Sequence, residues 1–165
     1  MMPRGVLLLA AVLALTGCHR REITQLERDE AANVVSEAEF AATLKEWGRA
    51  EGLYAKAVQL CPDDADTWVK LGIVRMRLDD HGGARSAYKS ALSAYKDYIA
   101  LNPTRTQAVL HRAFVYAILG EADEARASID KARAKNPDDR LLRSFVENGG
   151  IEKMLADPDL KNESP

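Results

Sequence analysis

The chain has 165 residues, of which 47% are hydrophobic, so it is long enough to bury the core of one domain without metals or disulfides. Its 23 Lys and Arg residues nearly balance its 25 Asp and Glu residues, which argues against a protein that binds the nucleic-acid backbone. Aromatic residues make up only 6%, and Ala, Leu, Glu, Lys and Arg dominate. Because this composition is typical of helices packed through small residues, we expect an all-α protein.

The N-terminus has the three parts of a secretory signal peptide: a positive charge at Arg4, an apolar run from Val6 to Leu15, and small residues before a cysteine. Ten apolar residues are too few for a membrane-spanning helix, which takes about 20. The segment Leu15-Thr16-Gly17-Cys18 resembles the bacterial lipobox, whose cysteine is acylated and becomes the first residue of the mature protein. The alternative is an ordinary cleaved signal peptide with an incidental cysteine.

The lipobox resemblance implies that residues 1–17 are removed and that Cys18 anchors the protein to a membrane through its acyl chains. The protein would then be lipid-anchored in the bacterial cell envelope, on the periplasmic face. Because His19 stands where Asp retains such lipoproteins at the inner membrane, the outer membrane is favoured if the source is Gram-negative. Residues 18–30 would form the acylated N-terminus and the start of the first helix, near Glu22.

A period of 34 residues, interrupted once by seven, organises most of the remaining chain. Small and bulky residues recur at offsets of 34 and then 41, as Ala50, Tyr54 and Ala57, then Ala84, Tyr88 and Ala91, then Ala125, Ile129 and Ala132. The prolines Pro62, Pro103 and Pro137 are spaced by 41 and then 34. Both series agree if seven residues are inserted between Ala91 and Pro103.

This unit resembles the tetratricopeptide repeat, whose pattern is Trp-x2-Leu-Gly-x2-Tyr, then Ala-x3-Phe, then Ala and Pro. The second unit matches the pattern best, with Trp68, Leu71, Gly72, Ala84, Tyr88 and Ala91. The resemblance implies a right-handed superhelix of about three helix-turn-helix repeats, at residues 31–64, 65–105 with the seven-residue extension, and 106–139. A capping helix at 140–148 and a loosely ordered tail at 149–165 complete the expected order.

Small residues explain how such helices pair. Ala38, Gly72 and Ala113 on the first helices, facing Ala50, Ala84 and Ala125 on the second helices, allow axes to approach to roughly 8–10 Å. Turns are expected at residues 46–48, 79–83 and 120–121. The inserted residues predict a helix from about Gly83 to Leu101, longer than its neighbours by about 10 Å. This extension is either a harmless length variation or a docking ledge for a partner.

The tetratricopeptide resemblance also implies that the first helices line a concave groove. The residues expected there are Val35, Glu39, Val69, Ile73, Met76, Arg77, Leu110, Phe114 and Ile118. Since most of them are apolar, the groove needs a cover, either a peptide or helix of a partner or the chain's own Ile151–Leu160 segment or N-terminal helix. Recognition of a C-terminal carboxylate is not expected, because Lys, Asn and Arg are largely missing from the corresponding positions.

No catalytic, metal-binding or cofactor-binding pattern is found. His19, His81 and His111 stand apart, without recurring carboxylate or cysteine spacing around them. Hydrolase, phosphate-loop and zinc-protease motifs are absent from the sequence. Cys61, before Pro62 at an expected helix end, is expected to be a small buried side chain.

The sequence therefore predicts a non-enzymatic scaffold that binds other proteins, with the membrane reached through Cys18. An adaptor in the assembly of an envelope, pilus or secretion complex is the favoured role, by analogy with small lipoproteins of this repeat type. A self-associating structural lipoprotein, and a carrier or hydrolase with an unrecognised site, are the alternatives.

Overall fold

The computed structural model describes residues 22–165, which form helices joined by short turns and contain no strand. The lipobox and Cys18 lie outside the described residues. The helices follow one another as α1 (Gln25–Thr43), α2 (Trp47–Leu60), α3 (Ala65–Arg77), α4 (His81–Leu101), α5 (Thr106–Ile118), α6 (Ala122–Lys135), α7 (Arg140–Glu147), α8 (Gly150–Leu155) and α9 (Pro158–Glu163).

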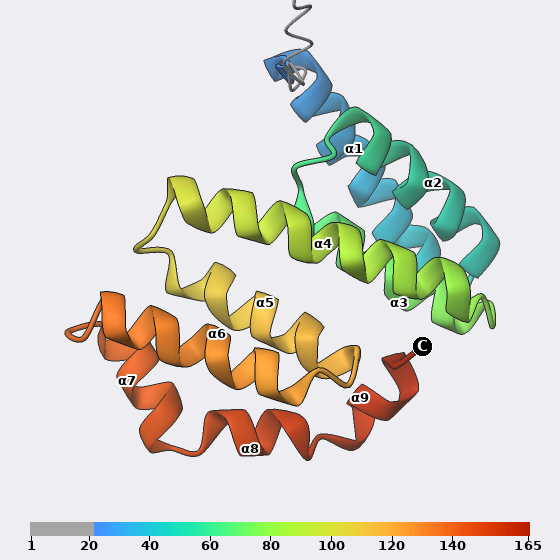
Figure 1. The fold of residues 1–165 in the computed structure, drawn as a ribbon. Helices are drawn as coiled ribbons and strands as arrows, with labels where there is room; N and C mark the ends of the chain where they lie inside the picture. Colours follow the sequence, from blue (N-terminus) through green and yellow to red (C-terminus); the bar gives the residue numbers. More distant parts are fainter. Residues whose placement is uncertain (1–21) are drawn as a thin grey trace, which may run out of the picture.

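Three consecutive helix pairs stack along the chain: α1 packs against α2, α3 against α4, and α5 against α6 (Figure 1). Neighbouring pairs join through α2 with α3 and α4 with α5. The helix α7 follows the third pair and packs on α6. This arrangement confirms the predicted all-α fold of about three helix-turn-helix repeats with a C-terminal capping helix.

Within each pair, small residues lie at the closest contact. Ala50, Ala84 and Ala125, which are equivalent in the three repeats, are all 0% exposed. The second repeat is especially tight, because a Cβ atom built on Gly72 would lie 2.4 Å from Cε1 of Tyr88. A larger residue at position 72 would therefore push against a ring that is itself fully buried.

The turn inside each pair repeats with the same spacing as the helices. Lys45, Asp79 and Gly120 all take a left-handed backbone conformation, with φ of 60°, 59° and 77°. They lie 34 and then 41 residues apart, although only the third is a glycine. The first two turns thus lie nearer the N-terminus than the expected ranges 46–48 and 79–83, because Gly48 and Gly83 already belong to the first turns of α2 and α4.

Each pair ends in a short extended link before the next. The residues Cys61, Asn102 and Asn136 close α2, α4 and α6 with φ near −130°, and a proline follows each of them. Proline disfavours helix in the residue before it, which explains the common geometry.

The seven inserted residues lengthen one helix, as expected. The helix α4 has 21 residues, whereas α2 and α6 have 14 each. The added turns at the C-terminal end of α4 contain Tyr95 and Tyr98, and α4 packs against α5 (Figure 1).

The C-terminal segment is more ordered than the sequence suggested. Residues 149–165, expected to be a loose tail, contain α8 and α9. Ile151 is buried against the third repeat and Leu160 between the second and third repeats. The two apolar side chains find partners there that local composition does not reveal.

Candidate protein-binding site

The predicted groove residues lie on α1, α3 and α5 but do not form an open apolar stripe. Val69, Ile73, Met76 and Phe114 are half-buried against the central core. Ile118 is 0% exposed and belongs to that core, so the exposure expected of it is not observed. Val35 is half-buried against the core between the first and second repeats, and Leu110 against the core between the third repeat and the C-terminal helices. Glu39 and Arg77 are exposed.

The helix α9 covers part of this face. Leu160 is buried in the core cluster against which Ile73, Met76 and Phe114 pack. The hydroxyl of Tyr88 donates to the main-chain oxygen of Glu163 at 3.0 Å. Burial raises the pKa of the Glu163 carboxyl, although Arg77 opposes the shift. The helix α9 thus packs against α3 and α5, and the chain's own C-terminal segment covers part of the predicted groove (Figure 1).

The upper part of the same face stays open, as a cavity of about 700 Å³ at the N-terminal ends of α3 and α5. The extension of α4 forms one wall with Tyr95 and Tyr98. The remaining lining residues come from α1, the α2–α3 link, the start of α3, the α4–α5 link and the N-terminal half of α5: Arg28, Cys61, Asp63, Asp64, Ala65, Asp66, Arg105, Gln107, Ala108 and His111.

Asp66 is the polar centre of this cavity. Its Oδ1 accepts a hydrogen bond from the hydroxyl of Tyr95 and lies 3.1 Å from Nδ1 of His111. The rings of Tyr95 and His111 meet edge to face, with centroids 6.3 Å apart. Burial, together with the hydrogen bond to Asp66, raises the pKa of Tyr95 well above its usual value. The Tyr95 hydroxyl therefore stays protonated and orients the carboxylate, whose side chain remains 58% exposed.

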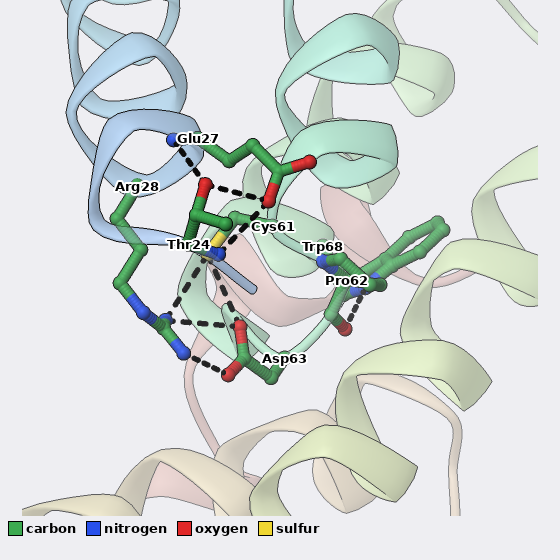
Figure 2. A network of polar contacts seen from close by, with 7 residues as sticks. All are labelled: Thr24, Glu27, Arg28, Cys61, Pro62, Asp63 and Trp68. Atoms are coloured by element: carbon green, nitrogen blue, oxygen red, sulfur yellow. Dashed lines mark hydrogen bonds and ion pairs between the residues drawn. The ribbon is translucent and has the colours of Figure 1, made fainter. Parts of the chain in front are cut away.

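A second polar network ties α1 to the α2–α3 link at the rim of the cavity (Figure 2). Arg28 donates from Nη1 and Nη2 to the two carboxylate oxygens of Asp63, at 3.2 and 2.8 Å. The thiol of Cys61 donates to the same carboxylate at 3.1 Å. Burial disfavours ionisation of Asp63, but the hydrogen bonds from Arg28 and Cys61 outweigh it and lower the pKa. Burial also raises the pKa of Cys61 to about 11, so this thiol is protonated at neutral pH.

The capping box at the start of α1 positions Arg28. Thr24 accepts from the backbone N–H of Glu27 at 3.3 Å, while the Glu27 carboxylate accepts from the backbone N–H of Thr24 at 2.9 Å (Figure 2). This reciprocal pair fixes the helix start at Gln25, three residues after the expected Glu22. On the opposite side of the link, the indole N–H of Trp68 donates to the carbonyl of Pro62 at 3.0 Å.

The cavity combines aromatic, acceptor and donor groups in its lining. Tyr98 offers an aromatic face, Asp66 offers acceptors, and Arg105 and Gln107 offer donors. None of the nine groove residues named from the sequence lines this cavity. Within residues 22–165, no group of three or more His, Cys, Asp or Glu side chains is arranged to hold a metal ion, and no helix has the length and apolarity needed to cross a membrane.

Comparison with curated proteins finds no match to the chain. A family model described as a tetratricopeptide repeat matches residues 84–148, from the second helix of the second repeat to the end of the capping helix. Together with the stacked helix pairs, this match supports a tetratricopeptide repeat protein, a class whose repeats generally mediate contacts between proteins.

Proposed function

We propose that the protein is a non-enzymatic scaffold that binds a segment of a partner protein in the cavity between α3, the extension of α4, and α5. The observation that carries the proposal is the cavity itself. The helix α9 covers the neighbouring part of the same face but leaves this cavity open. Its aromatic and hydrogen-bonding side chains resemble the rigid, mixed contacts that peptide-binding surfaces use. The extension of α4 then acts as a docking ledge.

The proposal includes an anchor at Cys18. The lipobox-like segment Leu15-Thr16-Gly17-Cys18 supports it, and it would hold the scaffold on the periplasmic face of the bacterial envelope, at the outer membrane of a Gram-negative cell. Such a position suits an adaptor in the assembly of an envelope, pilus or secretion complex. Replacing Cys18 with Ser should leave the mature chain without acyl mass in intact mass spectrometry. If the wild-type chain also lacked that mass, the anchor would be excluded.

Site-specific photocrosslinking in intact cells tests the binding surface. A photoreactive residue at Gln107, in the cavity, should yield a reproducible adduct with a different protein. The same residue at Glu124, exposed on α6, is the matched control and should not. Adding Tyr98→Ala should remove the adduct at position 107. Adducts with a second copy of the chain alone would instead favour the self-associating alternative, and equal labelling from both positions would contradict a specific site.

A further inference from the structure

A cationic cleft is lined by residues of α4, α5 and α6, none of which lines the proposed peptide-binding cavity. Two adjoining cavities of about 510 and 240 Å³ share Lys96 of α4, Arg112 of α5, and Ser128 and Lys131 of α6 in their linings. Lys135 extends the lining along α6. Three helices thus direct four cationic side chains at one space.

Arg112, on α5, is the unusual member of this group. Its Nε and Nη2 both donate to Oγ of Ser128, at 3.1 and 2.8 Å. Ser128 is buried and neutral, so it accepts two hydrogen bonds from Arg112 but does not balance the positive charge of the guanidinium. Burial lowers the pKa of Arg112, and no carboxylate offsets that effect. A partly desolvated guanidinium without a counter-ion is unfavourable, and a bound anion would relieve it.

The surrounding side chains reinforce this charge. No carboxylate belongs to the described lining of either cavity. Some cations elsewhere in the described chain pair with acids, such as Arg28 with Asp63, Lys56 with Glu30, and Lys70 with Glu39. Lys96, Lys131 and Lys135 take part in no ion pair of the described residues, although the chain as a whole is slightly acidic.

We propose that this cleft binds a phosphate group. A guanidinium can donate two hydrogen bonds to a phosphate in the plane of its fork, and three ammonium groups match a charge near −2 better than that of a single carboxylate. Ile99 and Val109 form an apolar wall beside the cations, so the ligand that carries the phosphate group can also have an apolar portion. A soluble phosphate compound and a phospholipid headgroup share this chemistry. The proposal does not depend on the peptide-binding cavity.

Thermal unfolding of the full chain tests the site, with inorganic phosphate added at constant ionic strength against a chloride reference. Phosphate should raise the unfolding midpoint by a few degrees at saturation, because a ligand of the native state stabilises it. Arg112→Gln should abolish the rise. Lys56→Gln, which removes one positive charge on α2, is the matched control and should keep it. An equal rise in wild type, Arg112→Gln and the control, or no rise in wild type, would overturn the proposal.

Two further measurements separate the alternatives. If Arg112→Gln is too unstable to compare, the double variant Lys131→Gln, Lys135→Gln changes only exposed side chains and should reduce phosphate affinity at least tenfold in calorimetric titration. Dihexanoyl phosphatidic acid, a soluble phospholipid, should bind more tightly than inorganic phosphate if a lipid is the source, and equally if a soluble phosphate is. Polyglutamate serves as a probe for an acidic protein surface. If it bound as tightly as phosphate and depended on Lys131 and Lys135 in the same way, the ligand would be such a surface, and the assignment to phosphate would be overturned.

Discussion

The contact between Gly72 and Tyr88 gives the sharpest test of how the repeats pack. In Gly72→Ala, the new methyl group would lie 2.4 to 2.8 Å from three ring atoms of Tyr88. That ring is fully buried, and its hydroxyl is held by the main chain at Glu163, so it has little freedom to move away. Overpacking of this kind costs about 1–3 kcal/mol.

Helix propensity works in the opposite direction. Alanine is favoured over glycine inside a helix by about 0.5–1 kcal/mol. The difference between these two ranges is a net loss of up to about 2.5 kcal/mol in the free energy of unfolding for Gly72→Ala. Its middle value is about 1 kcal/mol, or roughly 2–4 °C in the unfolding midpoint for a chain of this length. Gly52→Ala is the matched control, because nothing lies within 4 Å of its built Cβ atom on the exposed side of α2. Without a clash, it should gain about 0.5–1 kcal/mol.

Urea unfolding followed by circular dichroism measures both variants under the same conditions. The two substitutions make the same chemical change, so opposite signs would isolate the clash from helix propensity. The double variant Gly72→Ala, Tyr88→Leu should lose less than the sum of its single changes, since Leu lacks the ring atoms in conflict. A Gly72→Ala protein as stable as Gly52→Ala would refute the close approach.

Three further effects on stability are expected. Asp63 has a lowered pKa in the folded chain, so its contribution is complete above the unfolded pKa of about 3.9 and is lost as the pH falls through the folded value. Both partners of the Arg28–Asp63 pair are at least a third exposed, so solvent screening limits the contribution to under about 1 kcal/mol. Asp63→Asn should therefore flatten the acid side of the curve of unfolding free energy against pH. An unchanged curve would contradict the pairing. Asp64→Ala removes the acceptor for the N–H and the buried hydroxyl of Thr67 and should cost about 1–2 kcal/mol in urea unfolding, whereas a neutral result would exclude the cap. Leu160→Ala should cost about 2 kcal/mol or more and increase binding of a hydrophobic dye near Ile73 and Phe114; unchanged dye binding would mean that α9 does not cover them.

The repeats could be predicted from the sequence because their information is local and periodic. Ala84 follows Ala50 by 34 residues and Ala125 follows Ala84 by 41, and the seven additional residues locate the longer helix α4. The positions of the turns were less visible. Lys45 and Asp79 take the left-handed conformation that Gly120 takes in the third repeat, while the nearby Gly48 and Gly83 lie inside helices. The side-chain type alone does not show where the chain reverses.

The cavity could not be predicted from the sequence because it depends on contacts between distant segments. The cavity forms only when the α4 extension brings Tyr95 to Asp66, 29 residues earlier, and α5 brings His111 to the same carboxylate, 45 residues later. The insertion with two tyrosines was the available signal. Likewise, Leu160 is buried between the second and third repeats, so part of the expected groove belongs to the core. The repeat pattern describes each repeat alone and does not include this contact with α9.

The affinity of the crosslinked partner, measured by calorimetric titration, tests the central claim that this cavity captures another protein. Tyr98→Ala removes the 42% exposed ring on the cavity wall and should weaken binding at least tenfold. Leu101, at the same end of α4 but outside the cavity lining, has a side chain that is 82% exposed. Leu101→Ala should therefore leave the affinity unchanged within experimental error. Equal affinities for wild type and both variants would place the partner elsewhere and contradict the account.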